Sequence, residues 1–196
     1  MLERKGRFSI YSDEELMFYL GNGEVLAFDE LYERYSKRMM VYFTRMLNFN
    51  KIAAEDALQD LFLKIAEAPE KFDRNRSFKT WIFSVASNSC KNYYRHKQVV
   101  SASREELLYI ETGINENSFL RLAAKIDAGE FRKMLEEILE ELPLEKREAF
   151  ILKYQEEKTI AEIAFIQNCP EGSVKSRLHY TLKILEDRLK IFNPVI

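Results

Sequence analysis

The sequence predicts an all-α protein of two small helical domains joined by a flexible linker, with a helix-turn-helix in the C-terminal domain. Three observations support this prediction. Glycine and proline are scarce, at 6 and 4 of 196 residues. Apolar side chains recur at helical spacing over long runs in both halves of the chain. Between residues 98 and 129 this period is lost among polar and acidic residues, as is typical of a linker. The expected boundaries are 1–98, 99–129 and 130–196.

The N-terminal domain is expected to begin with a short helix capped by Ser12 or Asp13, since either side chain can accept a hydrogen bond from an N–H of the first turn. The run Gly21-Asn22-Gly23 then ends this helix. A long second helix follows. Its inward face is predicted from an apolar stripe at helical spacing: Leu31, Tyr35, Met39, Tyr42 and Met46.

A third helix is expected over residues 51–68, and it has two chemically different faces. Its inward face is apolar: Leu58, Leu61, Phe62 and Ile65. Its outward face carries the polar cluster Asp56, Gln59 and Asp60. Such a cluster is either a solvated helix face or part of a protein interface, and periodicity alone leaves both interpretations open.

A loop over residues 69–77 leads into a fourth helix over residues 78–97. Its inward face is expected at Phe78, Trp81, Ile82, Val85, Ala86 and Ser89, so Trp81 is assigned to the core. Between residues 71 and 97 there are seven lysines and arginines against a single carboxylate, Asp73. Cations interleaved with amides and tyrosines suit single-stranded DNA, because cations follow phosphates and aromatic rings stack on bases. One of Tyr93 and Tyr94 is expected to pack inside, and the sequence leaves open which.

The C-terminal domain is expected to start with a helix over residues 126–141, whose apolar stripe is Phe131, Leu135, Ile138, Leu139 and Leu142. Pro143 suits the first position of a further helix. Thr159 and Glu162 have capping-box spacing, and Asn168 suits a left-handed corner. After Pro170, one helix face is apolar at Val174, Leu178, Leu182, Leu185 and Leu189, which turns Lys175, Ser176, Arg177 and His179 outward. This pattern predicts a helix-turn-helix, although helical hairpins in bundles share it.

Composition and the absence of certain motifs argue against several classes of protein. The net charge is −2, so the local basic segment should bind nucleic acid weakly by itself and would suit a protein delivered to DNA by a larger partner. No apolar run reaches the roughly 18 residues that span a bilayer, and no signal peptide is visible, which predicts a cytoplasmic protein without membrane insertion. Two isolated cysteines, Cys90 and Cys169, predict neither a disulfide framework nor a metal site. No catalytic or cofactor motif is found, so the chain is predicted to be neither an enzyme nor a cofactor protein.

Several runs resemble bacterial sigma factors. Leu142-Pro143, Glu162-Ile163-Ala164 and residues 172–178 (GSVKSRL) resemble their C-terminal promoter-reading domain. Residues 27–35 (AFDELYERY), 54–62 (AEDALQDLF) and the spaced pattern FD…FxxW…AxN…NYYR over residues 72–95 resemble their N-terminal domain, in the form found in the extracytoplasmic-function group. Two positions depart from the pattern, since Asn168 replaces the commoner glycine and Tyr180 stands where a basic residue is usual.

The resemblance implies transcription initiation with core RNA polymerase and promoter DNA, commonly under an anti-sigma factor, with the linker passing through the polymerase cleft. Docking on the largest catalytic subunit would use Asp56, Gln59 and Asp60. Recognition and melting of the minus-ten element would use Phe72, Arg74, Asn75, Arg76, Ser77, Asn88, Lys91, Asn92 and Arg95, with Asn88 beside a flipped-out base. The minus-thirty-five element would be read by Ser173, Lys175, Ser176, Arg177, His179 and Tyr180.

Two other functions compete with this one. A stand-alone helix-turn-helix regulator would bind duplex DNA tightly as a dimer, but the basic 72–97 segment and the acidic balance of the chain count against it. A sigma-like decoy that sequesters an anti-sigma factor would have a degraded DNA-reading face. Tyr180 favours the decoy slightly, whereas the intact run Lys175-Ser176-Arg177 does not.

Overall fold

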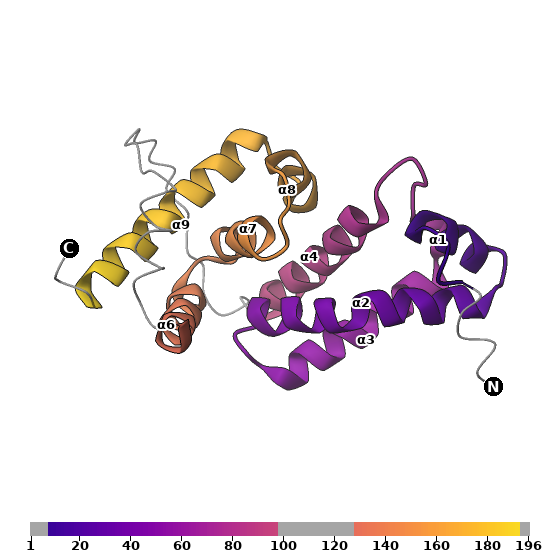
Figure 1. Ribbon diagram of the computed structural model, residues 1–196, viewed down its shortest axis with the longest axis horizontal. Helices are drawn as coiled ribbons and strands as arrows, with labels where there is room; N and C mark the ends of the chain where they lie inside the picture. The colour runs from indigo at the N-terminus through magenta and orange to yellow at the C-terminus, as the bar shows by residue number, and fades with distance from the viewer. Residues whose placement is uncertain (1–7, 98–127, 193–196) are drawn as a thin grey trace. The chain divides into compact units, whose positions relative to one another are not determined.

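The computed structural model describes residues 8–97 and 128–192, and the chain divides into two compact units between Lys97 and Gln98 (Figure 1). Throughout the described residues the regular structure is helical, which confirms the predicted all-α class. The predicted linker lies outside the described residues, apart from its last two positions, Ala128 and Gly129, which begin a helix.

The first unit is built around a long helix. Its elements are α1 (Asp13–Gly21), α2 (Val25–Met46), α3 (Lys51–Glu67), the 3₁₀ turn η1 (Pro69–Lys71) and α4 (Phe78–Lys97). Helix α2 packs against α1, α3 and α4. All five predicted stripe residues of α2 are buried, which confirms the inward face expected from their spacing. On α3, Leu61, Phe62 and Ile65 are buried as predicted, but Leu58 is only half-buried and borders a surface groove.

Local signals define the helix ends of this unit. Ser12, not Asp13, caps α1: the Ser12 Oγ accepts from the Glu15 N–H at 3.2 Å, and Glu15 Oε2 accepts from the Ser12 N–H at 2.7 Å. The Ser12 N–H and the Ser12 hydroxyl, which donates to Glu15 Oε2 at 2.9 Å, hold the pKa of the Glu15 carboxyl below its ordinary value. The helix stops before Gly23, whose φ of 88° is accessible to glycine at little cost. Asn50 caps α3 by accepting from the Ala53 N–H at 3.1 Å.

The second unit contains α6 (Ala128–Glu141), α7 (Leu144–Tyr154), α8 (Ile160–Gln167) and α9 (Glu171–Phe192). Helix α7 packs against α8 and α9, and α8 also packs against α9. One core cluster joins α6, α7 and α9 through Met134, Ile138, Leu139, Leu142, Phe150, Leu182 and Leu185. Of the stripe predicted for α6, Ile138, Leu139 and Leu142 are buried, while Phe131 and Leu135 are partly buried against the cluster. The predicted stripe residue Leu189 lies outside the side chains that the structure describes.

The helix-turn-helix of α8 and α9 follows the sequence signals closely. Thr159 and Glu162 form the predicted capping box at the start of α8. Asn168 ends α8 in the left-handed region at φ 53°, so the asparagine performs the role for which glycine is commoner. The Cys169 N–H then donates to the Ala164 carbonyl at 3.0 Å and closes the turn. Pro143 differs by one position from the prediction, because it precedes the first helical residue of α7.

Candidate nucleic-acid and protein interfaces

The predicted polar cluster of α3 lies on an exposed face. Asp56, Gln59 and Asp60 are all exposed, as the helical period requires. None of the three makes a hydrogen bond or ion pair with another described residue. Side chains that have no partner within the fold are available to a partner outside it. A protein surface is the more suitable partner for the two carboxylates, since DNA phosphates would repel them.

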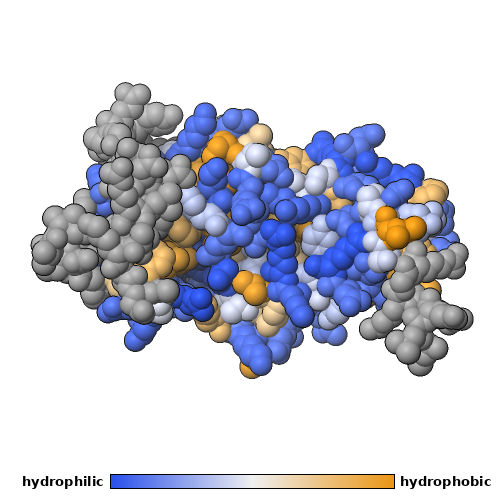
Figure 2. Space-filling view, viewed as in Figure 1, coloured by the Kyte–Doolittle hydropathy of each residue, from blue (hydrophilic) through white to orange (hydrophobic). Residues whose placement is uncertain are grey.

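An apolar groove runs beside this cluster, between α2 and α3. It has a volume of about 780 Å³ and is lined by Phe28, Tyr32, Glu55, Asp56, Leu58, Gln59, Phe62, Leu63 and Ala66. Its floor is aromatic, with the Tyr32 and Phe62 ring centroids 4.7 Å apart. The face shown in Figure 2 is largely hydrophilic with small, separate apolar patches. Nine large apolar side chains of the described residues are exposed. Tyr32 and Leu63 are two of them, at 45% and 52% exposure, and both line this groove.

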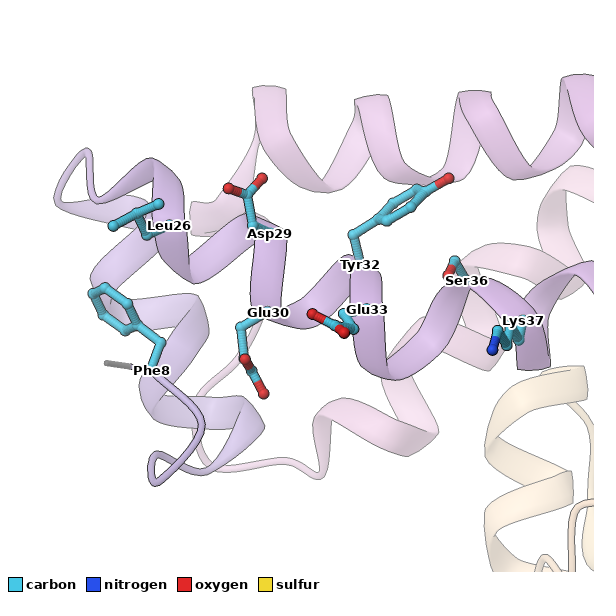
Figure 3. Close-up of a pocket in the computed structure, with 8 residues that line it drawn as sticks. All are labelled: Phe8, Leu26, Asp29, Glu30, Tyr32, Glu33, Ser36 and Lys37. Atoms are coloured by element: carbon cyan, nitrogen blue, oxygen red, sulfur yellow. The ribbon is translucent and has the colours of Figure 1, made fainter. Parts of the chain in front are cut away.

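A second hollow lies on another face of α2 and is lined mainly by polar and charged side chains. Figure 3 shows Asp29, Glu30 and Glu33 along this face, with Lys37 at one end and Phe8 at the other. Glu30 is paired with Arg34 at 2.8 Å, whereas Asp29 and Glu33 are exposed and make no contact with another described residue. These carboxylates would repel a phosphate backbone, so this face of α2 is excluded as a DNA-contacting surface.

The loop before α4 is folded by its own side chains. Asp73 Oδ1 accepts from the Asn75 N–H at 3.0 Å, and Asp73 Oδ2 pairs with Arg76 Nε at 3.2 Å. The Asn75 N–H is the main reason that the pKa of the Asp73 carboxyl lies below its ordinary value. This turn leaves the side chains of residues 74–77 exposed: Arg74, Asn75, Arg76 and Ser77.

Phe72 corrects the sequence-based assignment of this loop. Its ring is only 5% exposed and packs against Phe78 and Trp81, with centroids 5.5 and 5.3 Å away. A ring buried in this way supports the loop and presents no face to DNA, because the neighbouring aromatic rings cover it. Trp81, assigned to the core, is half-buried and belongs to the same cluster.

Helix α4 exposes a row of amides and a cation beyond this loop. Asn88, Asn92 and Arg95 recur at helical spacing, are exposed, and make no hydrogen bond or ion pair with the side chain of another described residue. Lys91 lies between them and is half-buried. The loop residues and this row together form the surface that the sequence assigned to the minus-ten element, with Phe72 removed from it. Exposed amides and cations can read base edges and follow phosphates.

The two tyrosines of α4 have different roles. The Tyr94 hydroxyl lies 2.9 Å from the Met46 carbonyl oxygen and 3.0 Å from Asn48 Oδ1, so it joins the end of α4 to the α2–α3 turn. Tyr93 lies under the Lys97 ammonium, 4.9 Å from Nζ to the ring centroid. Hydrogen bonding to the Tyr93 side chain raises the pKa of Lys97. Tyr94 is therefore the tyrosine whose hydroxyl is anchored within the fold.

We expect Tyr94→Phe to lower the free energy of unfolding by about 1 kcal/mol, because a partly buried carbonyl then loses its donor. The measurement is urea denaturation of the full chain. Tyr93→Phe is the matched control on the adjacent residue and should change stability by less than about 0.5 kcal/mol. Equal losses in the two variants would contradict the anchoring role of Tyr94.

The start of α9 presents fewer free side chains than its sequence suggests. Of the six predicted reading residues, Lys175 is exposed, whereas the others are half-buried: Ser173, Ser176, Arg177, His179 and Tyr180. The Nε2 atom of His179 is buried and has no hydrogen-bond partner among the described residues. The Tyr180 ring lies under Lys146, 5.7 Å from Nζ to the centroid. The expected outward orientation of His179 is therefore wrong.

Arg177 is the second correction, because its guanidinium turns towards the helix-turn-helix corner. Its Nη1 donates to Gln167 Oε1 at 2.8 Å and lies 3.2 Å from Cys169 Sγ. Gln167 is buried and in turn donates to Glu148 Oε2 at 3.0 Å. A chain of polar contacts thus runs from Glu148 in α7 through Gln167 at the end of α8 to the recognition helix. The sequence signal that could have indicated it is the polar Gln167 on the last, otherwise apolar turn of α8.

The described residues contain no group of three or more His, Cys, Asp or Glu side chains that could hold a metal ion. Within the same residues, no helix is long and apolar enough to cross a membrane. Cys90 is buried and Cys169 half-buried, and neither is in a disulfide.

Comparison with known proteins agrees with the geometry of both units. The family model for Sigma-70 region 2 matches residues 31–99, and that for Sigma-70, region 4 matches residues 132–185. The chain belongs to the sigma-70 family of RNA polymerase sigma factors. As a sigma factor it is a non-enzymatic initiation factor, which confirms the prediction that it is not an enzyme.

Curated sigma factors are similar to this one over nearly their full length. The ECF RNA polymerase sigma-E factor of Haemophilus influenzae is 25% identical over 183 residues, which cover 91% of this chain and 96% of the relative. The ECF RNA polymerase sigma factor SigW of Bacillus subtilis is 28% identical over 173 residues, which cover 86% of this chain and 91% of the relative. Since both sigma-70 regions are matched in order, a stand-alone helix-turn-helix regulator is disfavoured.

Two solved structures share the fold of this sigma factor. CnrH in complex with the cytosolic domain of CnrY has a TM-score of 0.65 at 21% identity, covering 91% of this chain and 97% of that one. The sigma factor RpoE in complex with the anti-sigma factor NepR from Bartonella quintana has a TM-score of 0.62 at 19% identity, covering 84% and 97%. At these identities the likeness concerns the fold.

Proposed function

We propose that this sigma factor docks on core RNA polymerase through the outer face of α3, melts the minus-ten element with residues 73–77 and the outer face of α4, and reads the minus-thirty-five element with the start of α9. One observation carries the proposal. The N-terminal unit has two exposed polar surfaces of opposite character. One is the pair of carboxylates Asp56 and Asp60 beside an apolar groove on α3, and the other is the row of Asn88, Asn92 and Arg95 on α4 together with the exposed loop residues 74–77.

The character of the α3 face favours a protein partner. Tyr32 and Leu63 offer apolar area in the groove, while Asp56 and Gln59, which also line it, offer hydrogen-bond acceptors. Asp60 adds a further exposed acceptor on the same helix. Protein interfaces combine these features, with a desolvated apolar centre surrounded by polar contacts that fix register and exclude wrong partners. Basic and amide side chains on the polymerase would complement the two carboxylates.

The character of the loop and α4 favours unpaired DNA. The turn at Asp73 already holds Asn75 and Arg76 exposed, so little conformational entropy is lost when they bind a strand. Asn88 and Asn92 can hydrogen-bond to the edges of unstacked bases, and Arg95 can follow the phosphates. Extracting a base from the duplex costs a few kcal/mol, which these contacts must offset.

Reading of the minus-thirty-five duplex is assigned to α9. Lys175 is the exposed cation at its start, and the half-buried Ser173 and Ser176 add hydroxyls beside it. A recognition helix enters the major groove with its N-terminal residues next to base edges and phosphates. With so few free cations and a net charge of −2, the duplex affinity of the isolated chain should be low. Promoter use would therefore depend on the polymerase.

We further propose that an anti-sigma factor controls this protein and that both act in the cytoplasm, where the polymerase works. The support comes from relatives, since both structural neighbours were solved as complexes, and the partner of one is named as an anti-sigma factor. A protein that co-purifies with the chain should compete with core polymerase for it and should abolish transcription. A co-purified protein that leaves both unchanged would count against this assignment.

The test of the whole proposal is transcription in vitro from fragmented genomic DNA of the source organism, with sigma-free core polymerase plus the purified chain. Sequencing of the 5′ ends should give start sites preceded by two shared elements at minus thirty-five and minus ten. Core polymerase alone provides the background. Transcripts that do not depend on the chain would favour the decoy alternative.

A further inference from the structure

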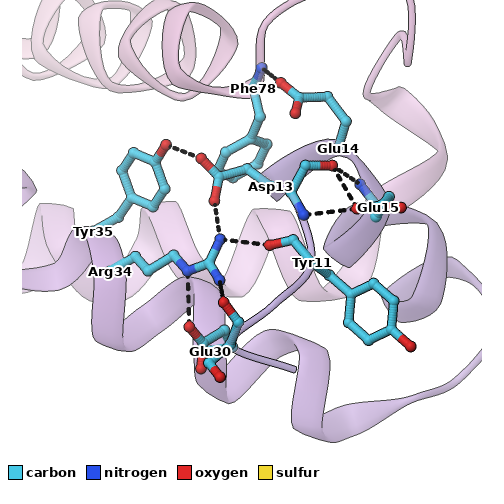
Figure 4. A network of polar contacts seen from close by, with 10 residues as sticks. Tyr11, Asp13, Glu14, Glu15, Glu30, Arg34, Tyr35 and Phe78 are labelled. Carbon is cyan, nitrogen blue, oxygen red and sulfur yellow. Dashed lines mark hydrogen bonds and ion pairs between the residues drawn. The ribbon is translucent and has the colours of Figure 1, made fainter. Parts of the chain in front are cut away.

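The start of α4 is held by a residue from the opposite end of its unit. Glu14, in the first turn of α1, accepts a hydrogen bond from the Phe78 N–H at 2.8 Å, across 64 residues of sequence (Figure 4). Phe78 is the first residue of α4, and an N–H at that position has no partner within its own helix. The adjacent Ser77 hydroxyl accepts only from the Thr80 N–H, at 3.4 Å. The shorter of these two hydrogen bonds at the start of α4 is therefore accepted by a residue of α1.

The same face of α1 also holds the other end of the loop. Phe18 lies four residues after Glu14, one helical turn further along. The Arg74 guanidinium carbon lies 3.9 Å from the centre of the Phe18 ring, which is within the range of a cation–π contact. Glu14 and Phe18 thus contact the two ends of residues 74–78, and the exposed loop residues Asn75 and Arg76 lie between them.

Helix α1 is itself fixed to α2, so it can act as a rigid support. Asp13 accepts from Arg34 Nη1 at 2.7 Å and, through its second oxygen, from the Tyr35 hydroxyl (Figure 4). Arg34 also donates to the carbonyls of Ser9 and Tyr11, both at 3.0 Å, and to Glu30 at 2.8 Å. A guanidinium that holds two backbone carbonyls and two carboxylates leaves the segment before α1 little freedom.

We propose that Glu14 and Phe18 are positioning residues that set the conformation of the loop, and through it the choice of minus-ten sequence. The inference rests on the proposed function of residues 73–77. Neither side chain needs to touch DNA. Glu14 fixes where α4 begins, Phe18 fixes the direction of Arg74, and together they determine how Asn75 and Arg76 meet an extruded base.

The test uses holoenzyme assembled from core polymerase and the full chain. Glu14→Ala should weaken binding of a fluorescent single-stranded minus-ten oligonucleotide by about tenfold, the equivalent of one lost charge-assisted hydrogen bond. Phe18→Ala should weaken it by about two- to fivefold, because the cation–π contact that it removes is exposed. Backbone hydrogen exchange over residues 74–78 should accelerate in both variants. Glu14→Gln keeps an acceptor and should recover most of the binding. Glu33→Gln changes an exposed carboxylate on α2 and should alter neither the oligonucleotide affinity nor the hydrogen exchange over residues 74–78.

The outcomes separate this inference from the proposed function. If Asn75→Ala with Arg76→Ala weakens oligonucleotide binding but Glu14→Ala and Phe18→Ala do not, the positioning role is wrong and the loop assignment stands. If the loop variant itself binds normally, the proposed function of the loop is wrong. A loss in Glu14→Ala with no change in exchange would also contradict positioning. Should Glu14→Ala fail to fold, Phe18→Ala decides, because that ring is already 44% exposed.

Discussion

Replacing Asp56, Gln59 and Asp60 together by alanine should weaken binding to core RNA polymerase by about 100-fold, close to 2.7 kcal/mol. The size of the effect follows from their state in the free protein. All three are exposed and uncommitted, so removing them costs the fold little, while the interface loses polar contacts beside a desolvated groove. The free energy of unfolding should change by less than about 0.5 kcal/mol.

A charge-matched control is available on the same unit. Asp29→Ala with Glu33→Ala removes two exposed carboxylates from the second hollow of α2 (Figure 3), as the α3 variant removes two from its face. Core affinity should not change in this control. Leu63→Ala, in the floor of the groove, should weaken docking by less than the triple variant. Unchanged affinity in the triple variant, or an equal loss in the control, would place the docking surface elsewhere.

Arg177→Ala should reduce promoter use by about tenfold or more and also destabilise the second unit by about 1–3 kcal/mol. The reason is the contact chain from Glu148 through Gln167. Without the guanidinium, Gln167 Oε1 loses its charged donor at 2.8 Å in a buried position, and the corner between α8 and α9 loses a brace. Core binding through the first unit should be unaffected. Lys175→Ala should weaken promoter binding to a similar extent with no loss of stability, since that side chain is exposed.

The energetic coupling between Arg177 and Gln167 shows whether Arg177 stabilises the helix-turn-helix corner or contacts DNA directly. In a double-mutant cycle, Arg177→Ala and Gln167→Ala should show an interaction energy of about 0.5–3 kcal/mol in unfolding, because each removes the same bond. Lys175→Ala and Gln167→Ala should be additive. If Arg177→Ala leaves stability unchanged and its effect on promoter binding is independent of Gln167, Arg177 reads DNA directly and the structural assignment fails.

Much of the fold follows from local signals in the sequence. The capping box at Thr159 and Glu162, the left-handed Asn168 and the stripe on α2 each depend on residues within one or two helical turns, and all three are found as expected. The inward faces follow from the 3.6-residue period for the same reason. The exposed cluster on α3 was predictable because burial of Leu61, Phe62 and Ile65 leaves its other face to solvent.

The parts that could not be predicted depend on contacts between distant residues. The Glu14–Phe78 bond joins positions 64 residues apart, and Arg34 reaches Asp13 across 21. No period or cap encodes such pairs. The side-chain contacts of Phe72 and Arg177 were not predicted for a related reason, since a motif indicates where a residue stands in the chain but not which neighbour its side chain meets. The aromatic cluster at Trp81 and the buried Gln167 determine those two side chains.

The central claim is that this protein works as a polymerase subunit, and its most direct test is fluorescence anisotropy of the labelled full chain with sigma-free bacterial core RNA polymerase, using duplex DNA alone as the control. We expect tight, saturable binding to core polymerase and only weak, salt-sensitive binding to DNA. Tight binding to duplex DNA without binding to core polymerase would contradict the claim, and binding to neither would indicate a decoy for an anti-sigma factor.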